Sequence, residues 1–494
     1  MKRLLSIIVA ISVAFSALAQ TPAQQYVNKL ATQAPLKDAV WGVLAKDAQG
    51  NTLVEYRSGT KMLPASNMKL ITTGTAMLAL GPDYRFPTSI GYTGTINAGT
   101  LEGDLYIIGG GDPTLCTRDS IAVSMAGVFR TWKRFIQKAG IDRIHGRIIG
   151  DGRLWDVQLE NSSWGYDDMG TFYGAGGNAL SFYANAVDFM PKIVEEGAVV
   201  PLEQTFPETP WMHIANRTRM APKGTGNSLL LFTTDLAPWA EIRGTLAVDR
   251  RPKLERFANK FGALTCAYYF WKELTGSGFE VSGGYADIDK DGLIRTGADF
   301  VSHEAAGAPE VIGTSYSPSL SRIALATNCR SDNFYAEACL RAMGFKATGS
   351  AQYDSCYVAE RAVLQQLGLP QDAIRIVDGS GLSRANYVTP AFIVEYLQKM
   401  QKTAVWTPFL NSLPHPGGNG TLKNVLRNSP EALKLRIRMK SGSMDGVLCY
   451  SGYILPADGQ QGGPITFSIL TNNCTADFAV VRDTITKILE LLAQ

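Results

Sequence analysis

The alternation of apolar and polar residues predicts strands near both ends of the chain. Residues 40–45 and 51–56 have the pattern of two strands joined by a turn. Residues 435–440, 447–454 and 465–470 have the pattern of three adjacent strands near the C-terminus.

Helical spacing predicts helices between and after these strands. Apolar residues from Met68 to Leu80 predict a buried helix that stops at Gly81. A helical pattern of apolar residues returns around Leu320 and continues to Leu340. A closing helix has one apolar face, which is formed by Val481, Ile485, Ile488, Leu489 and Leu492.

The long segment between the first helix and residue 320 differs in texture, because strand-like stretches alternate with glycines. Strands at both ends, helices between them and this excursion predict an α/β fold with one discontinuous domain. We expect residues 20–85 and 305–494 to form that domain. Residues 86–304 are then a large, mostly-β inserted region of one or two subdomains.

The N-terminus has the features of a processing signal. A positive start is followed by an apolar run over residues 4–15, which is too short to span a bilayer, and by the small residues Ala17 and Ala19. This pattern predicts a signal peptide over residues 1–19; the alternative is a buried helix or a retained anchor. We expect an exported, periplasmic protein with no transmembrane segment after cleavage.

Composition narrows the class of partner. A hydrophobic content of 45% and a charged content of 18% are ordinary for a globular protein. The net charge of +3 is too small to indicate nucleic acid binding, although it is compatible with an anionic wall polymer. The seven cysteines permit disulfides in an exported protein, but their odd number leaves at least one unpaired.

A candidate nucleophile lies at the start of the first predicted helix. Ser66 and Lys69 are three residues apart, so they share a helix face, and an uncharged lysine can activate a serine hydroxyl. Ser58 and Lys61 have the same spacing. We prefer Ser66 because it opens a hydrophobic helix, whereas Ser58 ends a predicted strand beside a glycine.

Two further motifs carry suitable chemistry. In Ser331-Asp332-Asn333 the serine can relay a proton and the Asn333 amide can bind a substrate amide, although all three residues also cap helices well. Lys440 and the Ser441 hydroxyl can hold a substrate carboxylate, and Gly442 lets a substrate backbone approach the strand. The alternative for this last motif is an edge strand with basic side chains in solvent.

Together these motifs form the set S-x-x-K, S-D-N and K-T-G of β-lactamases and penicillin-binding proteins, with Ser441 in place of threonine. Longer segments resemble the low-molecular-mass penicillin-binding proteins (penicillin-binding protein 4 type) that are D-alanyl-D-alanine carboxypeptidases and endopeptidases. The segments that carry this resemblance are 109–115, 316–320, 331–337, 378–384, 386, 388–390 and 420–422. Cys329 departs from the family, which usually has lysine two residues before Ser331.

The resemblance implies a penicillin-binding and β-lactamase-like domain, an antiparallel sheet with helices on both sides. It implies a serine D,D-peptidase that cleaves D-Ala-D-Ala bonds of peptidoglycan stem peptides through an acyl-enzyme on Ser66, with β-lactams as covalent inhibitors. The catalytic residues would be Ser66, Lys69, Ser331, Asn333 and Lys440, and the backbone N–H groups of Ser66 and Ser443 would form the oxyanion hole.

The resemblance also implies a subsite for the side chain of the stem peptide. Asp168 matches a family position whose carboxylate meets the ammonium of diaminopimelate, and Tyr173, Arg384 and Met444 match other members of that subsite. The alternative is that Asp167 and Asp168 belong to a polar loop with no such role.

Other sites and functions have weaker support. The segment 287–298 imitates a calcium loop, but Ala298 stands where a bidentate glutamate is required. We expect no metal and no organic cofactor. A β-lactamase shares the three motifs but usually has them closer together than Ser66 and Ser331 are. A non-catalytic β-lactam-binding or peptidoglycan-binding protein would not need the complete set.

Overall fold

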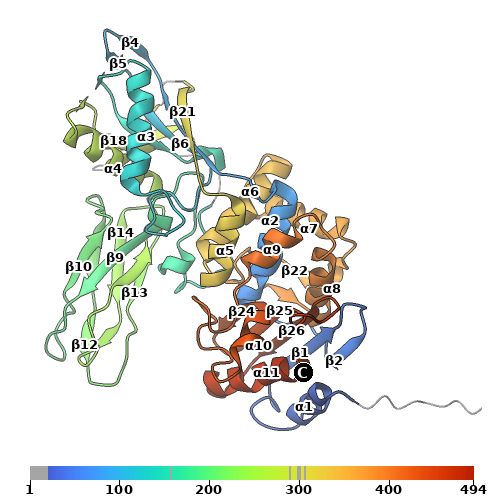
Figure 1. Cartoon of the computed structure of the whole chain (residues 1–494). Helices are drawn as coiled ribbons and strands as arrows, with labels where there is room; N and C mark the ends of the chain where they lie inside the picture. The colour runs from blue at the N-terminus through green and yellow to red at the C-terminus, as the bar shows by residue number, and fades with distance from the viewer. Residues whose placement is uncertain (1–19, 156–157, 289–290, 297–301, 305–306) are drawn as a thin grey trace, which may run out of the picture.

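A five-stranded antiparallel sheet organises the domain that carries the three motifs (Figure 1). The computed structural model describes residues 20–494 except for 156–157, 289–290, 297–301 and 305–306, so the predicted signal peptide and part of the calcium-like segment lie outside it. In the order β2–β1–β26–β25–β24, the strands are Thr52–Tyr56, Val40–Lys46, Ile465–Asn472, Val447–Ile454 and Ile437–Met444.

The strand predictions are confirmed, with boundaries that differ by up to four residues. The third strand from the C-terminus begins at Ile437, because residues 435–436 end the short helix α10 (Glu431–Arg436). At the centre of the sheet β1 pairs with β26, from Val40 opposite Asn472 to Lys46 opposite Thr466. The two ends of the chain therefore meet within one sheet.

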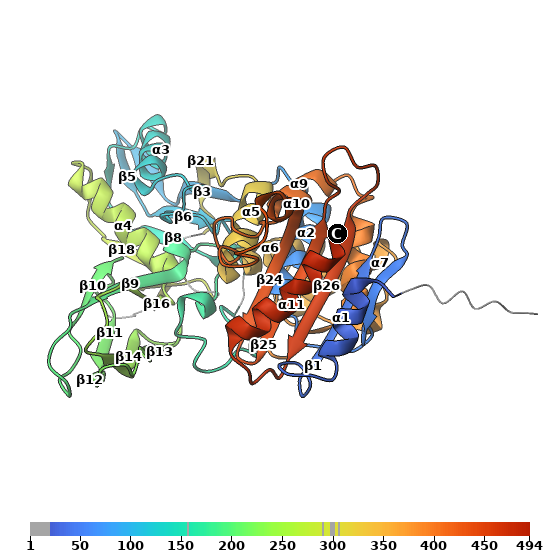
Figure 2. The same ribbon diagram turned by 60° about the horizontal axis from the view of Figure 1, so that its bottom comes forward.

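Helices cover both faces of this sheet, and the side chains of β25 show the division. Val447 and Cys449 pack in the core that includes α2 (Met68–Leu80) and α8 (Pro390–Met400). Leu448 and Tyr450 point the other way, into a core formed with α1 (Pro22–Leu30) and α11 (Phe478–Leu492). Figure 2 shows α1 and α11 lying across that second face. The remaining helices of the domain are α5 (Leu320–Arg330), α6 (Asn333–Thr348), α7 (Tyr353–Gln366) and α9 (Trp406–Ser412).

The helix after the first hairpin has the predicted burial and end. Every residue from Met68 to Met77 is buried, and Gly81 terminates α2 with a positive φ of 91°. Its start differs from the prediction, because Ser66 lies in a 3₁₀ turn (Ala65–Asn67) that leads directly into α2. The predicted apolar face of the closing helix is buried.

The inserted region leaves and rejoins the domain through paired strands. β3 (Pro87–Tyr92) follows α2, and β21 (Glu310–Tyr316) precedes α5; the two pair within a seven-stranded sheet of order β20–β19–β18–β8–β6–β3–β21. Since β21 belongs to that sheet, we propose that the inserted region ends near residue 316 and not at 304. This lobe lies beside the domain in Figures 1 and 2.

Two separate hydrophobic clusters support a division of the inserted region into two parts. One surrounds Trp132 and Phe270 between two helices, and the other surrounds Phe189 and Ile242 among short strands. The elements are α3 (Met125–Lys138), α4 (Gly262–Gly276), β4 (Thr95–Asn97), β5 (Thr100–Glu102), β6 (Leu105–Gly109), β7 (Arg143–Ile144), β8 (Ile148–Asp151), β9 (Ala186–Pro191), β10 (Leu202–Phe206), β11 (His213–Asn216), β12 (Arg219–Ala221), β13 (Leu230–Thr233), β14 (Trp239–Arg243), β15 (Thr245–Ala247), β16 (Glu255–Ala258), β17 (Glu280–Val281), β18 (Tyr285–Ile288), β19 (Leu293–Thr296) and β20 (Ser302–Glu304). Each of the seven cysteines is a free thiol in the structure.

Candidate active site

Lys69 lies at the centre of the candidate site and is completely buried. Its Nζ is 2.8 Å from the Ser66 hydroxyl, 2.7 Å from Oδ1 of Asn333 and 2.6 Å from the carbonyl oxygen of Ser380. The first contact follows from the spacing along the helix start, while the other two come from segments far along the chain. The structure thus brings the first two motifs into direct contact.

Burial changes the acid–base properties of Lys69. Desolvation lowers its pKa from 10.5 to about 8, and the negative charges of Asp378, Glu337 and Asp332 oppose that change. A lysine with this pKa can lose its proton near neutral pH and accept one from a neighbouring hydroxyl. The arrangement therefore provides a base beside the Ser66 hydroxyl.

Ser331, Asp332 and Asn333 each have a separate contact. Ser331 occupies the left-handed backbone region, with φ of 60°, where α5 ends, and its hydroxyl is 2.9 Å from Nζ of Lys440. Asp332 caps α6 by accepting the backbone N–H of Tyr335 at 3.0 Å. Asn333 uses its carbonyl oxygen for Lys69 and its amide nitrogen for the backbone oxygen of Tyr173. The helix-cap interpretation is confirmed for Asp332, whereas Ser331 and Asn333 contact the two lysines and not the cap.

Lys440 lies completely buried on β24. Burial, and then the charge of Lys69, lowers the pKa of Lys440 well below its ordinary value. Its Nζ also donates to the backbone oxygen of Ser441 at 2.5 Å. The interpretation of this strand as a solvent-exposed basic edge is wrong for Lys440.

Gly442 allows β24 to lie against the turn that carries Ser66. A side-chain carbon at position 442 would lie 2.6 Å from the Pro64 carbonyl oxygen and 3.0 Å from the Ser66 backbone nitrogen, which no side chain tolerates easily. Ser443, the next residue on β24, lines the same cleft as Ser66. The backbone of β24 therefore lies directly against the turn that carries Ser66.

A cleft of about 930 Å³ opens over these residues. It is lined by the candidates Ser66, Ser331, Asn333, Ser441, Ser443, Asp168, Tyr173, Arg384 and Met444. Lys69, Lys440 and Gly442 lie beneath this lining, where they contact it as described above. Every site residue predicted from the sequence is thus at one cleft or directly behind its wall.

The inserted region contributes one side of the cleft. Tyr173 lies in the short 3₁₀ helix Phe172–Gly174, and its backbone oxygen accepts from Asn333 at 3.1 Å. Burial and the neighbouring charge of Asp167 raise the pKa of Asp168. A bound ammonium group would relieve this unfavourable charge.

Cys329 supports the cleft through its backbone. Its carbonyl oxygen accepts the N–H of Thr421 at 3.1 Å, and the Thr421 hydroxyl accepts from Ser441 at 2.8 Å. Gly420, with φ of 95°, has no room for a side chain against the Cys329 carbonyl. The Gly420-Thr421 segment is therefore held between α5 and β24, and the thiol itself is part-buried.

Sequence reasoning assigned no role to Ser380 or to the buried carboxylates Asp378 and Glu337. Ser380 contacts Lys69 through a backbone carbonyl, which has no signature in the sequence. Asp378 lies within a segment that resembles the family, and that resemblance is the sequence signal that could have identified it. Within the described residues, no group of three or more His, Cys, Asp or Glu side chains is placed to hold a metal ion.

Sequence comparisons relate the chain to D-Ala-D-Ala carboxypeptidases. The profile of the D-Ala-D-Ala carboxypeptidase 3 (S13) family matches residues 23–494. The chain is 26% identical over 464 residues to a D-alanyl-D-alanine carboxypeptidase of Actinomadura sp. (strain R39), covering 92% of this chain and 81% of that protein. It is 24% identical over 447 residues to the D-alanyl-D-alanine carboxypeptidase DacB of Haemophilus influenzae, covering 86% and 84%.

A solved structure has the same fold. The crystal structure of penicillin binding protein 4 (dacB) from Haemophilus influenzae superposes with a TM-score of 0.78 at 23% identity and covers 94% of this chain and 98% of that one. The same protein complexed with a β-lactam gives a TM-score of 0.73 at 22% identity, with the same coverage of both chains. The expected penicillin-binding fold is therefore confirmed.

Proposed function

Because the chain belongs to the D-Ala-D-Ala carboxypeptidase 3 (S13) family and is a serine D,D-peptidase, we propose that Ser66 is its nucleophile and Lys69 its general base. The observation that carries this proposal is the 2.8 Å contact between the Ser66 hydroxyl and a completely buried lysine whose pKa is lowered to about 8. An activated serine next to such a base is suited to acyl transfer.

In the first step Lys69 takes the proton of the Ser66 hydroxyl while the oxygen attacks the carbonyl carbon of the penultimate D-Ala. The negative charge that develops on the carbonyl oxygen is bound by the backbone N–H groups of Ser66 and Ser443. Such donors are worth a few kcal/mol, about 3 in comparable sites. This role is supported by the close approach of β24 to the Ser66 turn.

In the second step the C–N bond breaks and the leaving amine needs a proton. Ser331 supplies it and takes one back from Lys440, whose Nζ is 2.9 Å away. The proton that Lys69 took from Ser66 then replaces the one that Lys440 gave up, so that both lysines return to their starting states. Lys440 and Ser441 also bind the terminal carboxylate of the substrate, and Asn333 orients its amide. Water then hydrolyses the ester on Ser66, with Lys69 acting again as base.

The substrates we propose are peptidoglycan stem peptides with D-Ala-D-Ala ends or the matching cross-link. Both substrates present a D-Ala carbonyl to Ser66, so carboxypeptidase and endopeptidase action share one mechanism. The Asp168 side of the cleft is supported as the subsite for the third residue because Asp168, Arg384 and Met444 line the same cleft. Digestion of purified muropeptides, with the products identified by mass, tests the assignment and gives the ratio of the two activities.

We also propose that residues 1–19 direct export to the periplasm, where β-lactams meet the enzyme as covalent inhibitors. None of the helices in the described part of the chain combines the length and the apolarity of a membrane span. N-terminal sequencing of the protein from a periplasmic fraction tests this placement, because cleavage after Ala19 predicts a first residue Gln20.

A further inference from the structure

Behind Lys69, two successive peptide groups connect helix α2 to two buried carboxylates. Lys69 donates to the carbonyl of Ser380 at 2.6 Å, and the N–H of that same peptide group, on Gly381, donates to Asp378 Oδ1 at 2.8 Å. Thr72, one turn further along α2, donates to the carbonyl of Gly379 at 2.8 Å. The N–H of that peptide group, on Ser380, donates to Oε1 of Glu337 at 2.7 Å.

Each peptide group therefore lies between a donor from α2 and a carboxylate on its far side. A carboxylate that accepts the N–H polarises the group and strengthens the carbonyl as an acceptor. The effect is directed at Lys69 in the Ser380–Gly381 group, where Asp378 is the acceptor. Asp378 is thus one peptide group away from the catalytic nitrogen.

Asp378 is completely buried and its two oxygens are fully used. The carboxylate accepts hydrogen bonds from the N–H groups of Gly381 and Ser383, the amide of Asn386 and the indole of Trp164, at 2.6–2.8 Å. A carboxylate with four donors at such distances is held in one orientation.

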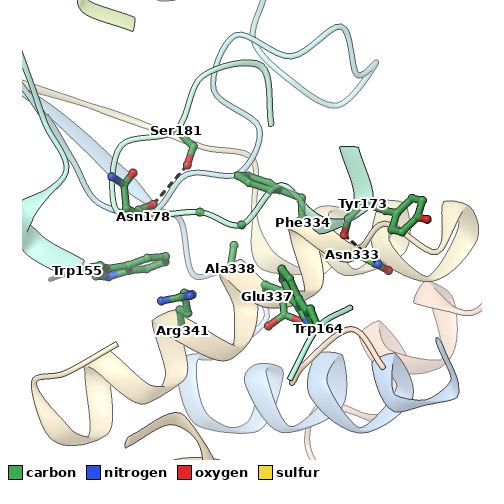
Figure 3. Close-up of a pocket in the computed structure, with 13 residues that line it drawn as sticks. Trp155, Trp164, Tyr173, Asn178, Ser181, Asn333, Phe334, Glu337, Ala338 and Arg341 are labelled. Atoms are coloured by element: carbon green, nitrogen blue, oxygen red, sulfur yellow. Dashed lines mark hydrogen bonds between the residues drawn. The ribbon is translucent and has the colours of Figure 1, made fainter. Parts of the chain in front are cut away.

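The Trp164 donor comes from the inserted region, four residues before Asp168. Figure 3 shows Trp164 beside Glu337, and both line a small pocket that Asn333 and Tyr173 also line. In the same loop, the Ser163 hydroxyl donates to that of Ser383 at 2.7 Å. The loop that forms one side of the cleft is therefore attached to the segment that holds Lys69.

We propose that Asp378 is a positioning residue for the catalytic base. Through the Ser380–Gly381 peptide group it holds Lys69 towards Ser66, and its negative charge attracts the positively charged form of the lysine. This inference rests on the proposed role of Lys69. Glu337 holds Thr72 of the same helix through the neighbouring peptide group. Trp164 fixes the Asp378 carboxylate from the inserted region.

The charged groups around Lys69 determine how strongly this lysine holds its proton. Asp378 and Glu337 face it from behind, Asp332 lies at the start of α6, and Lys440 approaches from β24. Around Glu337 are the charged Arg341 on its own helix and the hydroxyl of Tyr353 on α7. Burial, and then the charge of Asp378, raises the pKa of Glu337 to about 7, so Glu337 carries its negative charge mainly above that pH. Among the three carboxylates, Asp378 has the largest effect of charge on Lys69, followed by Glu337.

The test is the pH dependence of β-lactam acylation in single-turnover measurements on the full-length protein. Asp378→Asn removes a negative charge that favours protonated Lys69, so the acid limb is expected to move to lower pH by about one unit. The rate at the plateau is expected to fall as well, because the Ser380 carbonyl is less firmly held. Glu337→Gln should move the limb in the same direction by less.

Glu360→Gln is the matched control. Glu360 is also a completely buried carboxyl group behind α2, and it accepts from Thr75 of that helix at 3.0 Å. In the described structure Glu360 accepts from neither of the two peptide groups that Asp378 and Glu337 bind. Its substitution should therefore leave the acid limb of the pH profile in place. Burial raises the pKa of Glu360 to about 8, so this variant tests the loss of a buried carboxyl group and its hydrogen bond. An equal shift in this control would mean that replacing any buried carboxyl group behind α2 has the effect.

Trp164→Phe provides a variant that keeps the Asp378 charge, in case Asp378→Asn does not fold. With one donor fewer, the carboxylate attracts the ammonium group more strongly, and the acid limb should move to higher pH. If the acid limb of the pH profile stays in place in folded Asp378→Asn and Glu337→Gln, the proposal is overturned. An unchanged acid limb in Trp164→Phe also overturns it. Failure of the proposed function is distinguishable, because the wild-type protein would then show no acylation of Ser66.

Discussion

Nζ of Lys69 donates a hydrogen bond of 2.7 Å to the side-chain oxygen of Asn333. Lys69 lies on the helix before the inserted region, and Asn333 begins a helix after it. The contact therefore joins the two parts of the discontinuous domain at the proposed catalytic base. It also fixes the Asn333 amide so that its nitrogen faces the Tyr173 backbone at the cleft.

The first prediction concerns the nucleophile. Labelled penicillin should form a stable adduct on the peptide that contains Ser66, because a β-lactam presents a carbonyl to the same hydroxyl. Ser66→Ala should abolish labelling, as measured by mass spectrometry of the digested protein.

Ser58→Ala is the control, since Ser58 has the same spacing to a lysine. Its hydroxyl donates to Glu55 at 2.6 Å, away from the lining of the cleft. Labelling should therefore continue in this variant, and a persistent adduct in Ser66→Ala would show that the nucleophile is another residue.

The second prediction separates a peptidase from a β-lactamase. If the acyl-enzyme hydrolyses slowly, a chromogenic cephalosporin should be consumed at about one equivalent per enzyme over minutes. A burst followed by a flat trace is the expected record. Sustained turnover on the order of 10 per second, typical of enzymes, would support the β-lactamase interpretation instead.

The third prediction concerns the Asp168 subsite. A charge-assisted contact is worth about 1.5–3 kcal/mol, so Asp168→Ala should lower kcat/KM on diaminopimelate-containing peptides roughly ten- to a hundredfold. Cleavage of a truncated acyl-D-Ala-D-Ala that lacks the ammonium group should hardly change.

Asp167→Ala is the neighbouring control, because Asp167 also lines the cleft. It should not discriminate between the two substrates. Equal losses on both substrates in Asp168→Ala would mean that this carboxylate supports the structure of the cleft and does not read the side chain.

The fourth prediction follows from the Lys69 pKa of about 8. Below this pH the ammonium form dominates and cannot accept the Ser66 proton, so the acylation rate should rise with pH and level off above about 8. Single-turnover labelling between pH 5.5 and 9.5 measures the profile. Lys61→Met, at the lysine of the alternative motif, should leave it unchanged, whereas a wild-type rate already constant at pH 6 would contradict Lys69 as base.

The fifth prediction concerns stability in the inserted region. Lys260 is completely buried, with Nζ 2.6 Å from Glu160 and 2.9 Å from the backbone oxygen of Ala175. Lys260→Met leaves Glu160 buried without its partner, which costs about 3–5 kcal/mol. The denaturation midpoint in urea should fall accordingly. Lys192→Met breaks an exposed pair with Glu203 and should cost at most about 1 kcal/mol.

The parts of the fold that the sequence predicts are those with local signals. Strand alternation located β1, β2, β25 and β26, and helical spacing placed Lys69 beside Ser66. The predicted start of β24 is two residues too early, because the apolar Leu435 fits the strand pattern although it belongs to a short helix. The same spacing argument missed the 3₁₀ turn at Ser66, since both helix types bring residues three apart onto one side.

The features that sequence reasoning missed depend on distant contacts. β21 pairs with β3 across more than two hundred residues, and no pattern within residues 310–316 indicates that partner. The acceptor of Lys69 at Ser380 is a backbone oxygen 311 residues away, which any residue would supply. Motif matching found Ser331 and Lys440 despite their distance, because their side chains are specific to the chemistry.

The pairing of β1 with β26 affects how the enzyme is made. A nascent chain that ends before residue 437 contains Ser66, Lys69 and Ser331, but it has neither Lys440 nor the three strands against which β1 and the Ser66 turn pack. Long-range pairing of this kind forms late, after the connecting segments have folded. The protein should therefore be inactive during its synthesis. Truncation within β26 should abolish penicillin binding even though the nucleophile is intact.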